Sequence, residues 1–446
     1  MSMRILLSLT AMAALAFAVQ PAAAQTTGLV TGSANGRSIE LGRINFFPSF
    51  LADYGYVSNV FYSSGEDSGD EIIPSRLLVL QSRFAFDLPM GENWVRWSYS
   101  PIYRTYSSDA FTQTDPWSHF FDLDGRVKFG TRGFTAFKDH FVMGTQELRE
   151  VDPGGELTFG LTPFRVHQPS VEVGMQIGAR QTVSAIWRYD STQFDRSESN
   201  GAFNTRGWGL EGRFTYKMGP MTDLYGYYSQ NQSTQDRGGS PRDLVDIDDS
   251  SYGVGLTQSL NRDVVTQFLV GHQSMDFTGA SPTQFSGPIL SANASWVLDE
   301  ITRIAFNIRR QPYQSYYLDN NYYLNRTISL NLTRQTGATM YWTVGAGVEV
   351  NVYSDTIVAA DNPTIFCADD GSGGTVCPSD GVRRRDRGWS AQAGLGFMIG
   401  PASRAIIGYN YSARSSNILQ AFPGGFADPF DFTASRILFR IEAGWL

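Results

Sequence analysis

The feature of this sequence that most constrains its fold is a repeated alternation of apolar and polar residues. In residues 208–217 the even positions are apolar or aromatic, with one glycine, and the odd positions from 211 onward carry Glu, Arg, Thr and Lys. Residues 342–352 and 389–399 show the same alternation. Successive side chains of a β-strand point to opposite faces, so this period of two predicts strands with one apolar and one polar face.

The same pattern predicts an all-β chain with about eighteen strands. Sixteen strands are the alternative, because Lys138, Asp139 and His140 interrupt the alternation in the segment 134–149. The predicted strands are 41–62, 76–88, 93–107, 117–130, 134–149, 169–178, 181–195, 205–219, 222–236, 250–261, 263–277, 285–299, 302–315, 322–336, 339–353, 386–400, 403–417 and 432–446.

The connections between these strands alternate in length, which favours one architecture. Short turns such as 89–92 and 400–402 alternate with long polar loops, which we expect at 63–75, 150–168, 237–249, 354–385 and 418–431. An even number of strands with short turns at one end and long loops at the other is typical of a transmembrane antiparallel up-and-down β-barrel. The alternative is a soluble sandwich or propeller, but the strands of such folds are shorter.

The N-terminus predicts export from the cytoplasm. Arg4 precedes an apolar stretch from Ile5 to Val19, and an Ala-x-Ala sequence ends at Ala24. These are the parts of a secretory signal peptide, here residues 1–24, and the apolar stretch is shorter than the ~20 residues of a spanning helix. We expect residues 25–40 to be a short periplasmic N-terminal segment and residues 41–446 to form the barrel, in the outer membrane of a Gram-negative bacterium.

Composition excludes several other classes of protein. Charged residues make up 17% of the chain, the net charge is −8, and no run of Lys or Arg lies in a predicted structured core, so we expect no nucleic-acid partner. The four histidines, His119, His140, His167 and His272, lie in no hydrolase or zinc motif. We therefore predict that the protein is not an enzyme and has no cofactor or metal. Outer-membrane lipid is an expected partner.

Three short segments resemble a known family. The sequence of residues 47–61, FPSFLADYGYVSNVF, resembles the opening strand of an outer-membrane β-barrel porin family associated with exopolysaccharide biosynthesis loci. Residues 76–82 and 187–190 are similar to later strands of that family. The resemblance implies an outer-membrane channel for an anionic exopolysaccharide or oligosaccharide, with polysaccharide and periplasmic export components as partners. The alternative is a general diffusion porin for small solutes.

The polar faces of the predicted strands carry more bases than acids, which suggests an interior that favours anions. Rings of charge inside a pore select ions of the opposite sign. An equally weighted alternative is that arginines and carboxylates pair across strands and only brace the wall. The residues predicted to line the pore are Arg96, Arg188, Arg213, Arg303, Arg309 and Arg440.

The remaining predictions concern the cysteines and the C-terminus. Cys367 and Cys377 are the only cysteines, lie ten residues apart and flank a glycine-rich run, so we expect a disulfide within the loop 354–385. The last strand has Ile437, Phe439 and Ile441 on one face, and the chain ends shortly after an aromatic residue. Outer-membrane proteins typically end in this way, so we expect the barrel assembly machinery to be a partner.

Overall fold

The structure is a computed structural model in which most of the chain is described. The described residues are 38–65, 71–108, 115–147, 161–195, 204–236, 244–260, 264–279, 282–299, 301–315, 320–360, 366–369, 374–422, 425–428 and 430–444. The predicted signal peptide, residues 25–37 and the last two residues lie outside them. Within the described part of the chain, no helix is long and apolar enough to cross a membrane.

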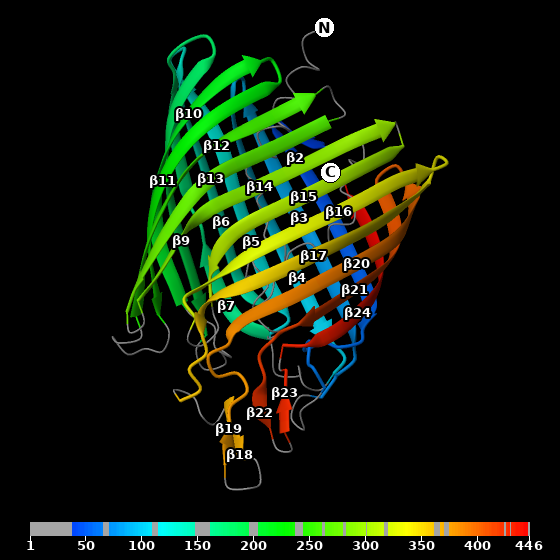
Figure 1. Ribbon diagram of the computed structural model, residues 1–446. Coiled ribbons are helices and arrows are strands. Elements are labelled where there is room, and N and C mark those ends of the chain that lie inside the picture. The colour runs from blue at the N-terminus through cyan, green and yellow to red at the C-terminus, as the bar shows by residue number, and fades with distance from the viewer. Residues whose placement is uncertain are drawn as a thin grey trace.

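The described chain forms a closed antiparallel barrel of eighteen strands, as the alternation predicts (Figure 1). The first barrel strand, β2, pairs with both β3 and the last strand, β24, so the wall has no free edge. The barrel strands are β2 (Ile44–Val57), β3 (Ser75–Met90), β4 (Asn93–Tyr106), β5 (Trp117–Phe129), β6 (Gly133–Glu147), β7 (Leu161–His167) with β8 (Ser170–Gln176), β9 (Gln181–Phe194), β10 (Asn204–Gly219), β11 (Thr222–Asp236), β12 (Leu244–Leu260), β13 (Val264–Thr278), β14 (Thr283–Asp299), β15 (Thr302–Gln314), β16 (Tyr322–Thr336), β17 (Met340–Thr356), β20 (Arg383–Gly400), β21 (Ser403–Ser415) and β24 (Phe432–Gly444).

Five shorter strands complete the set, although only one of them joins the wall. Strand β1 (Ile39–Leu41) forms a small hairpin with β2, turning at Gly42. Two separate hairpins lie beyond the barrel: β18 (Ala368–Asp369) with β19 (Thr375–Val376), and β22 (Gln420–Phe422) with β23 (Gly425–Ala427).

The two faces of the wall have opposite chemistry. On β24, Ile437, Phe439 and Ile441 are 53%, 44% and 39% exposed, whereas Leu438 and Arg440 on the other face are buried. In lipid every backbone polar group must be satisfied internally, and barrel closure achieves this. A closed barrel with an even number of antiparallel strands and an apolar outer surface is the architecture of outer-membrane proteins. The protein is therefore an outer-membrane barrel.

Connection lengths define the two ends of the barrel. At one end neighbouring strands are joined by short turns, as between β3 and β4, β10 and β11, or β20 and β21. The longer connections, together with hairpins β18–β19 and β22–β23, lie at the opposite end (Figure 1). Outer-membrane barrels have short periplasmic turns and long extracellular loops. The end with the two extra hairpins is therefore extracellular.

The structure assigns residues of several expected loops to wall strands. The expected loop 150–168 contains β7, and β7 and β8 both pair with β6 and β9, so they are two halves of one wall strand. The expected loop 237–249 is wrong from residue 244, where β12 begins. The acidic residues of this segment are typical of a loop in sequence. They fit within a strand because neighbouring strands supply partners: Asn231 and Gln273 donate hydrogen bonds to Asp249.

The sixteen-strand alternative is wrong because β6 is a full member of the wall. Its interrupting residues have partners: His140 Nδ1 lies 2.6 Å from Asp122 Oδ1, and Asp139 Oδ1 lies 3.1 Å from His167 Nε2. Cross-strand pairs of this kind stabilise a sheet in place of apolar contacts. A break in alternation thus marks a pairing site within a strand.

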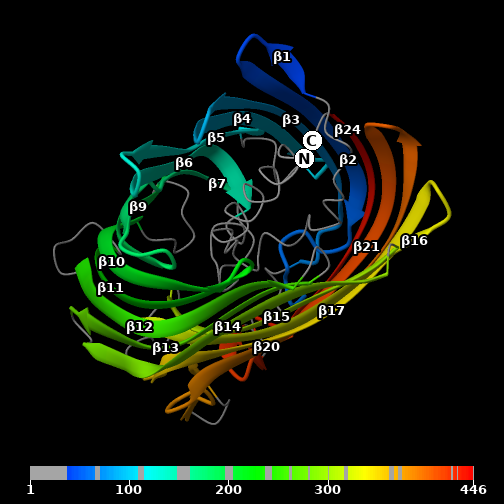
Figure 2. The same ribbon diagram turned by 90° about the horizontal axis from the view of Figure 1, so that it is seen from above.

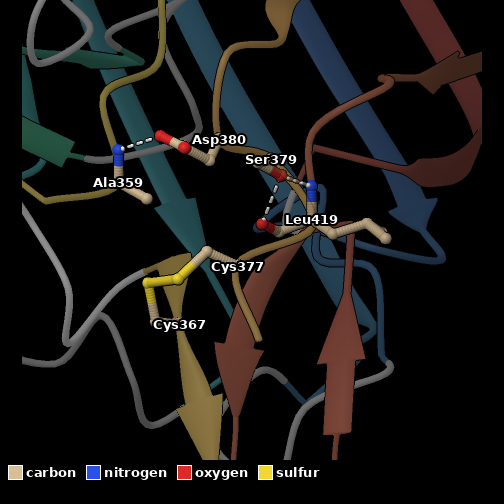
Figure 3. The surroundings of a disulfide bond; sticks show 6 residues. All are labelled: Ala359, Cys367, Cys377, Ser379, Asp380 and Leu419. Carbon is tan, nitrogen blue, oxygen red and sulfur yellow. Dashed lines mark hydrogen bonds between the residues drawn. A yellow bond between two sulfur atoms is a disulfide. The ribbon is translucent and has the colours of Figure 1, made fainter. Parts of the chain in front are cut away.

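The expected loops 354–385 and 418–431 pack together into an extracellular knob. Ile357, Ala359, Phe366 and Ile418 form its buried core. Cys367 and Cys377 are joined by a disulfide, and Ser379 Oγ both accepts a hydrogen bond from Leu419 N and donates one to Leu419 O (Figure 3). Much of the glycine run between the cysteines lies outside the described residues. Residues 383–385 belong to β20 rather than to the loop.

Glycines on the wall leave space for aromatic rings on neighbouring strands. A Cβ atom at Gly396 on β20 would lie 2.1 Å from Cζ of Tyr341 on β17, and one at Gly255 on β12 would lie 2.1 Å from Cζ of Tyr225 on β11. Each ring therefore lies flat over a glycine of the adjacent strand. This packing keeps large inward-facing rings against the wall rather than across the interior.

Candidate functional site on the inner wall

The candidate site is the inner face of the barrel, because the polar residues of the strands gather there. Figure 2 views the barrel along its axis, with the strands surrounding the interior. The register places Asp53 opposite Arg440, Asp87 opposite Arg96, and Gly209 opposite Arg188, on the face opposite the exposed apolar residues. Five of the six predicted arginines lie next to polar or charged partners in the structure.

One charged region spans β3 to β6. Arg96 Nε donates to Asp87 Oδ1 at 3.1 Å, and Ser98 Oγ donates to Asp122 Oδ2 at 3.2 Å. Asp122 also contacts His140 on β6. These groups border a recess of about 200 Å³ in the wall, lined by Phe47, Arg83, Ala85, Phe86, Asp87, Arg96, Trp97, Ser98, Asp122 and Asp124. The recess presents both cationic and anionic groups to the interior.

A second cluster lies on β9 and β10, where two arginines share one carboxylate. Glu211 is buried, and both Arg188 Nη2 and Arg213 contact it, with Arg213 Nε donating to Glu211 Oε1 at 2.8 Å. The Arg213 guanidinium also lies 5.0 Å from the centre of the Tyr225 ring. This cluster of two bases and one acid carries a net positive charge.

A third cluster joins the last strands to the first. Arg440 donates from Nε and Nη2 to the two carboxylate oxygens of Asp53, at 2.6 and 2.7 Å. Arg440 Nη1 also lies 3.5 Å from Glu442, which accepts a hydrogen bond from Arg404 Nε at 2.5 Å. The four side chains alternate in charge and balance one another, so they brace the wall where the barrel closes.

The two arginines on β15 differ from the other four. Arg303 is exposed, and Arg309 is buried and donates to the hydroxyl of Tyr313 at 3.0 Å. Among the described residues, neither is within ion-pair distance of a carboxylate. Arg303 and Arg309 therefore add positive charge to this side of the wall that no neighbouring acid offsets.

A further charged cluster, which the sequence reasoning placed partly in a loop, lies near the extracellular end. Arg384 donates from Nε and Nη2 to Asp386 at 3.0 and 2.7 Å, and both side chains are almost fully buried. The Arg384 guanidinium lies between aromatic rings, 3.5 Å from the centre of Phe430 and 4.3 Å from that of Tyr353. A search for alternation missed this pair because it lies at the very start of β20.

Sequence reasoning also missed other charged residues of the inner wall. The register adds Lys138 and Arg384 to the bases and Asp53, Asp223, Asp249 and Asp386 to the acids. The excess of bases on the wall is therefore narrower than the sequence suggests. Strict use of the alternation would have found Asp53, inside β2, and Asp386, near the start of β20, whereas Lys138 was set aside as an interruption.

The extracellular opening of the barrel is narrowed by the end of strand β15, which contacts the inner face of β11. Gln314 Nε2, at the end of β15, donates to Ser233 Oγ on β11 at 3.2 Å, although three strands lie between β11 and β15 in the wall. Gln235 Nε2 donates to the carbonyl oxygen of Ser315 at 3.3 Å, and both residues are fully buried. The tip of hairpin β15–β16 therefore folds inward.

The same tip packs against β13 and β14. Asn321 Nδ2 donates to Thr283 Oγ1 at 2.8 Å, and the Tyr322 ring stacks on Phe277 with ring centres 5.6 Å apart. The register shows why the tip can move away from the wall: pairing between β14 and β15 runs from Asp299 only as far as Leu290. The extracellular part of β15 is thus not held in line with β14.

Within the described residues, no group of three or more His, Cys, Asp or Glu side chains could hold a metal ion. The clusters above are salt-bridged or hydrogen-bonded pairs. What the arrangement offers chemically is a set of weak, exchangeable contacts for a charged solute in water.

No family model matches the chain, and no curated protein matches it. Among solved structures, the outer-membrane protein OpdK of Pseudomonas aeruginosa matches with a TM-score of 0.44 at 9% identity, over 90% of this chain and 99% of that one. OccK3 (OpdO) of the same organism matches with a TM-score of 0.44 at 12% identity, over 90% and 96%. The siderophore receptor PirA of P. aeruginosa matches with a TM-score of 0.40 at 12% identity, over 90% and 80%.

Proposed function

We propose that the protein is a diffusion channel for small solutes across the outer membrane, with a preference for anions. Support for a channel comes from the closed barrel, whose inner wall is polar and charged. A barrel of sixteen to eighteen strands is wide enough to leave an aqueous path between its walls. Catalysis has no part in this proposal.

The observation that carries the choice of small solutes is the bond between Gln314 and Ser233. It ties the tip of hairpin β15–β16 to the inner face of β11 and so reduces the extracellular opening. A narrow extracellular opening admits small solutes and hinders the passage of a polysaccharide. The passage of an exopolysaccharide, predicted from the resemblance, therefore has less support than the diffusion porin that was its alternative.

The preference for anions rests on arginines that are not balanced by a carboxylate. Arg303 and Arg309 have no carboxylate partner among the described residues, and the Arg188–Glu211–Arg213 cluster has one base in excess. A guanidinium offers a carboxylate two parallel hydrogen bonds, and conduction requires contacts that are weak and repeated. A small carboxylate could move along such contacts without being held by any of them.

The test is transport by the purified protein. In planar bilayers under a salt gradient, the reversal potential should show anion selectivity. In liposome-swelling assays, small carboxylates should enter faster than neutral sugars of equal size, and long oligosaccharides should not enter. Cation selectivity would contradict the anion preference, and rapid entry of long oligosaccharides would favour the polysaccharide alternative.

A measurement in cells separates the two alternatives independently. Deletion of the gene should slow the uptake of small carboxylates and leave the amount of extracellular polysaccharide unchanged. A loss of extracellular polysaccharide with normal small-solute uptake would overturn the proposal.

A further inference from the structure

Three arginines lie on the outer face of β16 and β20, the strands on either side of β17. Arg326 on β16 is opposite Val350 on β17, and Val350 is opposite Arg387 on β20. Arg385 lies two residues from Arg387, on the same face. Because neighbouring strands lie about 4.8 Å apart, the arginines span about 10 Å across the wall. We name Arg326, Arg385 and Arg387 the outer arginine row.

These side chains point away from the interior, toward the membrane side of the wall. They share a face with Ile328, Val348 and Trp389, which are 50%, 55% and 51% exposed. Arg326, Arg385 and Arg387 are themselves exposed. The neighbouring register row toward the periplasm is entirely apolar and consists of Ile308, Ile328, Val348 and Trp389.

The outer arginine row lies at the extracellular edge of the apolar belt. Arg326 is four residues from the start of β16 and Arg387 is four residues from the start of β20, and both strands start at the extracellular end. Just below it, the Trp389 ring packs against Tyr411, with centres 4.7 Å apart. Aromatic girdles mark the interface between lipid tails and headgroups. The row is therefore at the level of the outer-leaflet headgroups.

The charges of the row are not offset by the protein. In the part of the chain that the structure describes, no carboxylate forms an ion pair with any of the three arginines. Arg326 is also directly opposite Arg310 in the register, and like charges in that relationship destabilise a sheet. The outer-face acids on β12 contrast with this, because Gln232 and Thr234 donate hydrogen bonds to Asp248 and Asp246.

We propose that the outer arginine row binds the phosphate groups of a phosphorylated glycolipid in the outer leaflet. Guanidinium groups bind phosphate through two parallel, charge-assisted hydrogen bonds. The apolar row beneath would contact the acyl chains of the same molecule while the arginines hold its headgroup. A lipid is favoured over a dissolved anion because the arginines and the apolar row form one continuous surface facing the membrane.

The experiment measures lipid binding by native mass spectrometry of the protein purified in a mild detergent. The probe is bisphosphorylated lipid A, compared with its dephosphorylated form and with inorganic phosphate. The test variant is Arg326→Ser/Arg385→Ser/Arg387→Ser. The matched control is Arg334→Ser, which changes an exposed outer-face arginine of β16 at the periplasmic end of the same strand.

The unmodified protein and the Arg334→Ser control should retain bisphosphorylated lipid A equally. The triple variant should bind it at least about tenfold more weakly, since several charge-assisted contacts are lost together. Replacement of the same three residues by Lys should restore part of the binding. Dephosphorylated lipid A should bind the unmodified protein as weakly as the phosphorylated form binds the triple variant.

Three results would overturn the proposal. The first is equal binding of lipid A by the triple variant, and the second is equal binding of dephosphorylated lipid A by the unmodified protein. The third is displacement of the lipid by inorganic phosphate at equal concentration, which would indicate a site for free anions. If the triple variant does not show the heat-modifiable migration of a folded barrel, Arg326→Ser and Arg387→Ser are tested singly. Both positions are exposed, and each change should weaken binding relative to Arg334→Ser; unchanged binding in both would refute the site.

Discussion

Arg440 and Asp53, 387 residues apart in sequence, form a two-point ion pair between the last and first strands of the barrel. The Nε–Oδ1 and Nη2–Oδ2 distances are 2.6 and 2.7 Å, and both side chains are buried. The pair lies at the seam where β24 meets β2, so it forms only once the whole barrel has closed. It connects the ends of the chain through side chains in addition to the backbone ladder.

Removal of one partner at this seam should destabilise the barrel. Asp53→Ala leaves the Arg440 guanidinium buried without its main partner, and breaking a buried pair in this way costs about 3–5 kcal/mol. We expect a lower midpoint of urea unfolding in detergent, measured by the heat-modifiable shift on gels. In contrast, Asp53→Leu/Arg440→Met should recover much of the loss, because no uncompensated charge remains. Equal stability of Asp53→Ala and the unmodified protein would contradict a role in closure.

Channel selectivity should depend on the two arginines of β15 that lack carboxylate partners. Arg303→Gln/Arg309→Gln removes two positive charges from the inner wall, so the ratio of anion to cation permeability should fall several-fold. Folding should change little, since no acid is left unpaired. Reversal potentials in planar bilayers measure the effect, with Arg334→Gln on the outer face as the control. An unchanged ratio would mean that these arginines do not face the permeating ions.

The inward-folded tip of hairpin β15–β16 should limit conductance. Gln235→Ala/Gln314→Ala removes two hydrogen bonds worth about 0.5–1.5 kcal/mol each, so the tip should leave the inner face of β11 more often. We expect larger or more variable single-channel conductance and faster entry of oligosaccharides into liposomes. The control is Gln232→Ala. Gln232 is on β11, as Gln235 is, but its exposed side chain contacts Asp248 on the outer face of the wall. If Gln235→Ala/Gln314→Ala and the Gln232→Ala control have the same conductance, the hairpin tip does not restrict the channel.

The disulfide should order the extracellular knob without affecting the barrel. A bond that closes so short a loop contributes about 3 kcal/mol or less. Cys367→Ser/Cys377→Ser should therefore increase protease cleavage within residues 357–382 while the heat-modifiable shift of the barrel stays the same. Alkylation of freshly prepared unmodified protein should add no mass, and detection of two free thiols would exclude the bond.

The sequence by itself was sufficient for the all-β class, for a barrel of about eighteen strands and for the face on which most residues of the wall lie, whereas the structure excluded sixteen strands. A side-chain period of two is a local property, and the register of neighbouring strands preserves it around the whole barrel. Strands such as 208–217 and 389–399 could be read directly for this reason. Segments 134–149 and 244–249 were harder, because their polar residues are paired with groups on neighbouring strands rather than placed by alternation.

Only the tertiary structure decided which charges are paired and how open the channel is. Alternation shows that Arg440 and Asp53 face inward, but their contact depends on β24 closing against β2. The bond from Gln314 to Ser233 depends on β15 leaving β14 after Leu290, which no local pattern predicts. The outer arginine row likewise exists only because the register aligns β16, β17 and β20. Contacts between residues distant in sequence arise from register and curvature, and these are properties of the closed barrel as a whole.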